Sequence, residues 1–274
     1  MMASLDLIDS WPVPNAAAAV LDSSGTTVAS RGDTQRVFPL ASVTKLLSAY
    51  ALLVALEEEA LALDLPAGPE GSTVRHLLAH ASGYDFSSDV VRASPGSRRI
   101  YSNTGFDVLG RTLQQETGIA FADYLSEAVL QPLGMESTGL DGSPAADATS
   151  TVEDLSRFAA ELLRPTLVSS TTMSRATTVQ FSGLDGVLPG YGRHKPNDWG
   201  LGFELRGTKD PHWTGNGNSP QTFGHFGQSG TFLWVDPTAG LACVALTDRD
   251  FGPWAVEAWT PFNDAVIADF SGSP

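Results

Sequence analysis

The chain has 274 residues, 42% of them hydrophobic and 17% charged, which suits a globular protein with a substantial core, built as one large domain or as two lobes in close contact. Its formal net charge of −15 and isoelectric point near 4.5 disfavour nucleic acid and anionic membrane surfaces as partners. The single cysteine, Cys243, lies in an apolar run, so we expect a buried core thiol and no intramolecular disulfide.

The N-terminal residues 1–6 contain neither the basic region nor the apolar segment of a secretory signal. No apolar run in the sequence is long enough to cross a bilayer. We therefore expect a cytoplasmic protein.

The first part of the chain carries strand and helix signals in turn. Residues 16–22 and 26–30 flank a Ser-Ser-Gly turn and predict a β-hairpin. An apolar helix is expected from Ser42 to about residue 59. A shorter helix is expected over residues 74–80, ended by Gly83 in the left-handed conformation.

The middle of the chain shows three amphipathic helical patterns, at residues 106–118, 121–130 and 152–163. Residues 183–224 are rich in Gly, Pro, Asn and aromatic residues, which predicts loops. Within them, residues 199–205 alternate like a strand.

The C-terminal part returns to strands. Residues 231–235 and 241–247 predict two strands joined by a tight turn, and residues 254–270 predict a closing helix that packs across a sheet. Because strands lie at both ends of the chain and helices in the middle, we predict an α+β fold in which terminal strands pair in one antiparallel sheet flanked by helices, with an inserted all-helical lobe.

This fold places a discontinuous sheet lobe at residues 1–40 and 200–274 and a mainly helical lobe at residues 41–199. A cleft between two such lobes is the usual place for a site. His76 and His80 lie four residues apart on one expected helix, but the segment lacks the glutamate of a metalloprotease helix and an obvious third ligand. We therefore predict packing or capping histidines and no metal site.

Ser42 and Lys45 form a Ser-x-x-Lys pattern at the start of the apolar helix. Residues three apart share a helix face, so the lysine amine is expected over the serine hydroxyl. Serine is a poor nucleophile until a base takes its proton, and lysine can be that base only if burial lowers its pKa. Alone, the pattern is equally consistent with a helix N-terminus and a solvated lysine.

Two further segments accompany it in order: Tyr101-Ser102-Asn103 and His225-Phe226-Gly227. Together the three segments resemble the motif set of the serine β-lactamase and penicillin-binding-protein superfamily, in which Ser-x-x-Lys is paired with two later motifs. The Tyr-x-Asn form resembles class C β-lactamases and their esterase and D-aminopeptidase relatives. The chain has no Gly-x-Ser-x-Gly elbow, which argues against an α/β-hydrolase.

The resemblance implies a β-lactamase/transpeptidase-like fold and a role for each matching residue. Ser42 would be the nucleophile that accepts the acyl group, and Lys45 and Tyr101 would share its proton, with either one as the general base. Asn103 would hydrogen-bond Lys45 and the substrate. Taken singly, Tyr101 is also typical of a core residue and Asn103 of a helix N-cap.

The same resemblance implies an oxyanion hole made by the backbone N–H groups of Ser42 and Gln228. His225 would sit on the strand edge facing Tyr101, where the family often has lysine, although a lone histidine there is more often structural. Gly227 would let the backbone approach the substrate closely.

Two departures from the family pattern bear on the substrate. His225 replaces lysine, so we expect a positive charge that depends on pH. Phe226 replaces the Thr or Ser whose hydroxyl helps to hold a substrate carboxylate, and phenylalanine offers no hydrogen bond. We therefore expect weak β-lactamase activity at most and a preference for uncharged esters or amides.

Three functions follow as alternatives. The first is a serine hydrolase that works through an acyl-enzyme on a small ester or amide, without a cofactor. The second is a true β-lactamase or DD-peptidase acting on a β-lactam or peptide, and the third is a non-catalytic binding protein on the same scaffold. The oligomeric state stays open.

Overall fold

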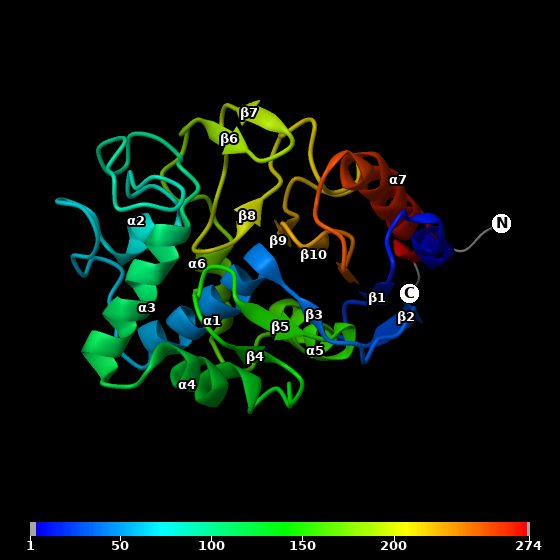
Figure 1. Ribbon diagram of the computed structural model, residues 1–274, viewed down its shortest axis with the longest axis horizontal. Coiled ribbons are helices and arrows are strands. Elements are labelled where there is room, and N and C mark those ends of the chain that lie inside the picture. The colour runs from blue at the N-terminus through cyan, green and yellow to red at the C-terminus, as the bar shows by residue number, and fades with distance from the viewer. Residues whose placement is uncertain (1–3, 273–274) are drawn as a thin grey trace.

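A six-stranded antiparallel sheet forms one side of the molecule, as shown by the computed structural model, which describes residues 4–272 (Figure 1). Its outer strand β2 pairs with β1, and β1 pairs with β11 from Ala16↔Thr247 to Leu21↔Ala242. The predicted pairing of N- and C-terminal strands is therefore confirmed. The order is β2 (Thr27–Arg31), β1 (Ala16–Leu21), β11 (Leu241–Thr247), β10 (Thr231–Asp236), β9 (Phe223–Gly227) and β8 (Glu204–Leu205).

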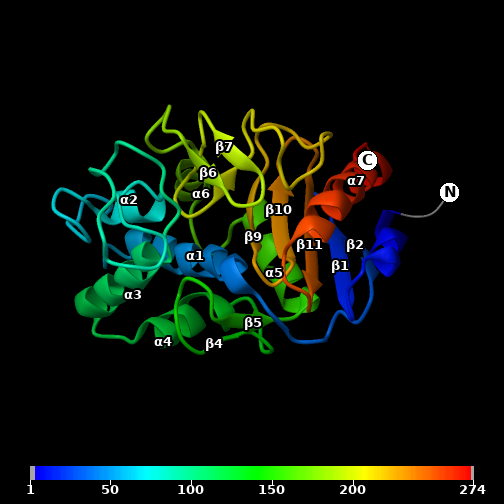
Figure 2. The same cartoon turned by 45° about the horizontal axis from the view of Figure 1, so that its top comes forward.

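Both faces of the central strands are covered, which explains why every residue of β10 and β11 is buried. Helix α5 (Val152–Leu163) packs on one face, and α7 (Pro253–Phe270) covers the other together with the 3₁₀ helix η1 (Ser4–Ser10) (Figure 2). Cys243 lies in the core beneath α7. Trp234 of β10 donates to Asn263 of α7 at 2.8 Å.

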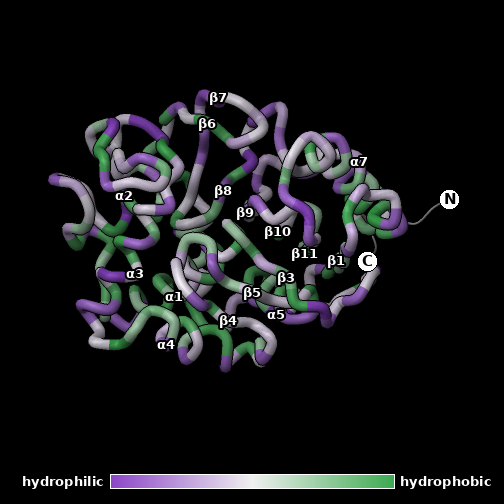
Figure 3. The backbone as a smooth tube through the Cα atoms, in the orientation of Figure 1, coloured by the Kyte–Doolittle hydropathy of each residue, from purple (hydrophilic) through white to green (hydrophobic). Residues whose placement is uncertain are grey.

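Helix α1 (Thr44–Glu57) runs through the middle of the helical side (Figure 1) and is buried along almost its whole length. Figure 3 colours the same backbone by the hydropathy of its residues. Packed around α1 are short elements of the inserted segment. They are α3 (Asn103–Thr117), α4 (Phe121–Leu125), the π-helical turn η3 (Ser126–Leu130) and α6 (Ser170–Ala176). Helix α2 (Val74–Leu78) packs against α3. Helix α5 also belongs to residues 41–199, although it packs against the sheet, and the division into two lobes stays a prediction.

Several local predictions need correction. The Ser102 hydroxyl, not Asn103, caps α3 by accepting from the Gly105 N–H, so Asn103 is the first helical residue. Helix α2 ends at Leu78, and Gly83 (φ 91°) lies beyond its end. Ser42 itself lies in a 3₁₀ turn, η2 (Ala41–Val43), ahead of α1.

The stretch 183–224 holds more structure than its composition indicates. It contains a hairpin of β6 (Gly186–Leu188) and β7 (Gly192–His194), and only Glu204–Leu205 of the expected strand 199–205 is a strand. A second small sheet, also not predicted, orders β3 (Phe38–Pro39), β5 (Ala148–Ser150) and β4 (Gly139–Leu140). Strands of two or three residues are too short to carry a periodic pattern.

Across residues 4–272, the helices are too short or too polar to traverse a bilayer.

Candidate active site

Ser42 lies at the junction of the helical side and the sheet, in the turn η2 between β3 and α1. Two hydroxyls from the β9–β10 turn fix the segment before it: Ser229 Oγ donates to the Pro39 carbonyl at 2.7 Å, and Thr231 Oγ1 donates to that of Leu40 at 2.9 Å. The residue before the serine, Ala41, has φ of 44°, a left-handed backbone that costs a non-glycine residue about 1 kcal/mol or more. The nucleophile is thus held in a strained turn by its neighbours.

Gly227 lets β9 pack directly against this turn. A Cβ at position 227 would lie 2.4 Å from the Leu40 carbonyl oxygen and 2.6 Å from Thr231 Oγ1. Real side chains do not tolerate such contacts, so glycine is required for β9 to approach the segment that carries Ser42. The expected close approach of this glycine to a substrate stays a prediction.

Lys45 is completely buried one helical turn after Ser42. Its Nζ lies 2.6 Å from Asn103 Oδ1, 2.8 Å from the Ala145 carbonyl oxygen and 3.4 Å from Ser42 Oγ. Burial lowers the pKa of Lys45 to about 7, against an opposing effect of the Asp107 carboxylate. The neutral amine is therefore accessible at neutral pH.

The three partners of Lys45 suit a neutral amine. The Asn103 and Ala145 oxygens can only accept, so they take the two N–H groups of the amine. The remaining lone pair can accept the Ser42 hydroxyl proton. When the amine is protonated instead, its Nζ lies 4.6 Å from the centre of the Tyr101 ring and 5.5 Å from that of Phe106, where ring faces stabilise a cation.

The Tyr101 hydroxyl is buried and makes no hydrogen bond within the described part of the chain. Burial raises the pKa of Tyr101, although its interaction with Ser42 acts in the opposite direction. The phenol is therefore protonated at neutral pH. In this form it can donate its proton, but it cannot act as a base, which would require the phenolate.

His225 is also buried, and its chemistry differs from the expectation. Its Nδ1–H donates to the Phe226 carbonyl at 2.6 Å, which leaves Nε2 as an acceptor without a partner among residues 4–272. Burial and the nearby Lys45 lower the pKa of His225 to about 3. The imidazole is therefore neutral at neutral pH, and the expected pH-dependent positive charge would form only in strong acid.

A cavity of about 100 Å³ joins these groups beside Ser42. Five of the predicted site residues line it: Ser42, Tyr101, His225, Phe226 and Gln228. The remaining lining residues are Phe86, Leu188, Pro189, Trp199 and Glu204. Lys45 and Asn103 lie behind Ser42, and Gly227 lies outside the lining.

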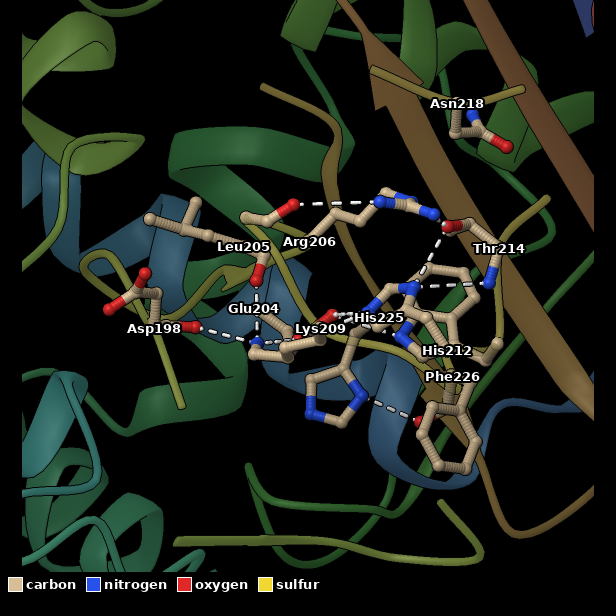
Figure 4. Close-up of polar contacts among 12 residues, drawn as sticks. Asp198, Glu204, Leu205, Arg206, Lys209, His212, Thr214, Asn218, His225 and Phe226 are labelled. Carbon is tan, nitrogen blue, oxygen red and sulfur yellow. Dashed lines mark hydrogen bonds and ion pairs between the residues drawn. The ribbon is translucent and has the colours of Figure 1, made fainter. Parts of the chain in front are cut away.

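Glu204 is part of a buried polar cluster that the sequence did not reveal (Figure 4). Its carboxylate accepts hydrogen bonds from Lys209, from His212 Nε2 at 3.0 Å and from Trp213 Nε1 at 2.9 Å. Lys209 also donates to the carbonyls of Asp198 and Leu205. An ionised glutamate is thus part of the cavity wall, with its charge balanced by Lys209.

The two histidines of the α2 segment have packing roles, as predicted. His80 Nδ1 accepts from the Ser102 N–H at 3.1 Å, and its ring lies against those of Tyr101 and Trp199. His76 Nδ1 hydrogen-bonds Thr73 Oγ1 at 2.9 Å. Within residues 4–272, no cluster of three or more His, Cys, Asp or Glu side chains could hold a metal ion.

Known proteins share this architecture. The β-lactamase family model matches residues 9–266. A crystal structure of a β-lactamase from Mycobacterium bovis is 60% identical, with a TM-score of 0.97 over 98% of this chain and 100% of that one. The structure of EstCE1, a hydrolase with promiscuous acyltransferase activity, is 19% identical with a TM-score of 0.75 over 96% of both chains, which shows a shared fold.

Among curated proteins, a candidate D-alanyl-D-alanine carboxypeptidase of Salmonella enteritidis is 25% identical over 206 residues. That match covers 59% of this chain and 48% of the relative. The chain spans about half or less of the length of the curated relatives it matches.

Proposed function

We propose that this chain, which belongs to the β-lactamase family, is a serine hydrolase that cleaves small esters or amides through an acyl-enzyme at Ser42. The observation that carries this proposal is the environment of Lys45. A lysine with a pKa near 7, its two N–H groups engaged and Ser42 Oγ at 3.4 Å, is suited to take the serine proton.

In the acylation step, Ser42 Oγ attacks the substrate carbonyl carbon while Lys45 Nζ accepts the hydroxyl proton. The negative charge that develops on the carbonyl oxygen would be bound by the backbone N–H groups of Ser42 and Gln228, two residues that line the same cavity. The ammonium formed on Lys45 is stabilised by the faces of Tyr101 and Phe106.

The tetrahedral intermediate then collapses, and the bond from the carbonyl carbon to the leaving oxygen or nitrogen breaks. Tyr101 is the proton donor to the leaving group in this scheme, because its hydroxyl stays protonated and has no partner within residues 4–272. Its proton is restored from the Lys45 ammonium. In deacylation, water attacks the acyl carbon while Lys45 takes its proton. The bond from that carbon to Ser42 Oγ then breaks, a proton returns to Ser42, and the acid is released.

The expected preference for an uncharged group next to Phe226 rests on the nature of this side chain. Its side chain lines the cavity at the position where the family pattern has Thr or Ser, and it is fixed among Tyr191, Trp213, Phe251 and Trp259. A carboxylate placed against this ring would lose water without gaining a hydrogen bond, which is costly. The neutral His225 offers no positive charge in compensation.

A second candidate is β-lactam hydrolysis, favoured by the 60% identity over nearly the whole chain to the β-lactamase from Mycobacterium bovis. The third alternative, a non-catalytic binding protein, is disfavoured by the complete set of Ser42, Lys45 and Tyr101 around one cavity.

One experiment separates the three: intact mass of the wild type and of Ser42→Ala after exposure to a fluorophosphonate and, separately, to a penicillin. We expect a phosphonyl adduct on the wild type only, with slow penicillin hydrolysis at most. A long-lived penicilloyl adduct or rapid penicillin turnover would favour the second candidate. No adduct from either reagent, or equal adducts on both proteins, would contradict catalysis by Ser42. Ser174→Ala is the matched control, because Ser174 is exposed on α6 and lies outside the cavity lining.

A further inference from the structure

A second cleft, of about 460 Å³, opens beside the catalytic cavity. The two share Phe86, Tyr101 and Pro189 in their walls, so they meet at the tyrosine next to Ser42. This cleft lies between the loop after α2 and the β6–β7 hairpin, which sit side by side in Figures 1 and 2. A substrate held at Ser42 that extends past Tyr101 enters it.

The cleft is built on a buried arginine. Arg99 is 3% exposed, and its guanidinium donates to the carbonyls of Asn197 at 3.0 Å and Gln180 at 2.7 Å. Its backbone lies so close to Gly186 of β6 that a Cβ there would stand 2.4 Å from the Arg99 carbonyl oxygen. These contacts fasten the hairpin to the loop, so the cleft is preformed.

The charge of this cleft is opposite to that of the molecule. Four of the chain's 16 basic residues line it, and no acidic residue does, although the chain has 31 acids. Two of these arginines are paired at the rim, Arg92 with Asp85 at 2.8 Å and Arg193 with Asp185. The third, Arg98, is exposed and has no hydrogen bond or ion pair within residues 4–272. The rim of three arginines and two aspartates thus carries one surplus positive charge.

The cleft also offers apolar surface. Phe86 is 50% exposed and Val187 is 60% exposed, and both line it. An apolar chain or ring that lies between them and ends in an anionic group would fill the cleft and reach the free guanidinium.

We propose that this cleft is a subsite for the anionic, carboxylate-bearing end of the substrate, with Arg98 as the residue that selects it. The inference rests on the proposed serine hydrolase activity and refines it. The expectation of an uncharged substrate then holds for the end next to Phe226, while the end beyond Tyr101 is negatively charged.

The test uses two matched pairs of esters, because the charge can lie on either side of the scissile bond. In one pair the acyl group differs: mono-4-nitrophenyl glutarate against 4-nitrophenyl pentanoate. In the other the leaving group differs: 4-acetoxybenzoate against phenyl acetate. For each pair, the ratio of kcat/KM for the anionic ester to that for the neutral ester is measured.

We expect the wild type to favour the anionic ester in at least one pair. Arg98→Ala should lower that ratio about tenfold, mainly through KM, because a hydrogen bond to a charged group is lost. Arg98→Lys should retain part of the preference, and Arg111→Ala, at an exposed arginine on α3 outside both cavities, should leave it unchanged. The preference should also weaken between about 20 mM and about 500 mM salt.

A ratio that Arg98→Ala leaves unchanged in both pairs overturns the subsite. Failure of the proposed activity is recognised separately, since the neutral esters would then be cleaved equally by wild type and Ser42→Ala. In that event, calorimetric binding of 4-acetoxybenzoate to Ser42→Ala decides. An affinity that falls when Arg98→Ala is added supports the subsite, and an unchanged affinity contradicts it.

Discussion

Gly227 of β9 packs tightly against Leu40, whose carbonyl oxygen lies where a side chain at position 227 would begin. Leu40 in turn precedes the strained Ala41 and the nucleophile Ser42. The position of the nucleophile therefore depends on the absence of a single methyl group on the neighbouring strand.

Gly227→Ala should displace the turn that carries Ser42. We expect kcat/KM for an activated ester to fall about 10- to 100-fold, because a shift of about 1 Å in a catalytic group has such an effect. The free energy of unfolding should fall by about 1–3 kcal/mol from overpacking. Ester hydrolysis and urea unfolding measure both quantities.

Gly139→Ala is the matched control, since nothing lies within 4 Å of a Cβ at that strand position and its backbone is not left-handed. Wild-type activity in Gly227→Ala would show that the turn adjusts without moving the nucleophile, and would remove the role given to this glycine.

The pH dependence of the reaction should report Lys45. Because the neutral amine is the base, kcat/KM should rise with pH and reach half of its plateau near pH 7, the value to which burial lowers the pKa of Lys45. Lys45→Arg stays protonated and should lose about 10²–10⁴-fold in kcat/KM. A profile that is flat from pH 6 to 8 would exclude this assignment. Lys195→Arg, at an exposed lysine, is the control and should retain the wild-type profile.

The elements with strong periodicity and caps were predictable from the sequence. Helix α5 has the predicted bounds of residues 152–163, and Thr151 Oγ1 accepts from the Asp154 N–H at its start. Its apolar stripe faces the sheet, so local pattern and tertiary packing agree. The three motif segments were also predictable as candidates, because each one carries its chemistry in three or four consecutive residues.

What could not be predicted depends on contacts distant in the sequence. Glu204 lies in a stretch of glycines and aromatic residues, where a glutamate indicates a surface position. It is buried only because Lys209 and His212 fold back onto it. The low pKa of His225 could not be predicted from the sequence either, because it results from burial and from the nearby Lys45, which is distant in the chain.

Breaking the Glu204–Lys209 pair should strongly lower the free energy of unfolding. Glu204→Gln removes the countercharge of a fully buried lysine, and loss of one partner of a buried pair costs about 3–5 kcal/mol. A double-mutant cycle with Lys209→Met should give a double variant that is more stable than the sum of the single effects predicts.

Glu153→Gln provides the matched comparison, because Glu153 pairs with Arg157 on the surface of α5 and exposed pairs contribute about 0–1 kcal/mol. Equal, small effects of Glu204→Gln and Glu153→Gln in urea unfolding would show that the buried cluster does not hold the cavity wall in place.

The neutral state of His225 should appear in the acid stability of the protein. The pKa of His225 is lowered to about 3 in the folded state from an ordinary 6.5, so between these values the unfolded chain binds the proton and the folded chain does not. Stability should therefore fall as pH falls from about 6.5, by up to about 1.4 kcal/mol per pH unit for each such histidine.

His225→Gln should make this slope shallower, while His80, whose pKa burial also lowers, keeps part of it. His76→Gln, at a partly exposed histidine, should change the slope less. A slope that His225→Gln does not alter would mean that the imidazole takes up its proton in the folded protein as readily as in the unfolded chain.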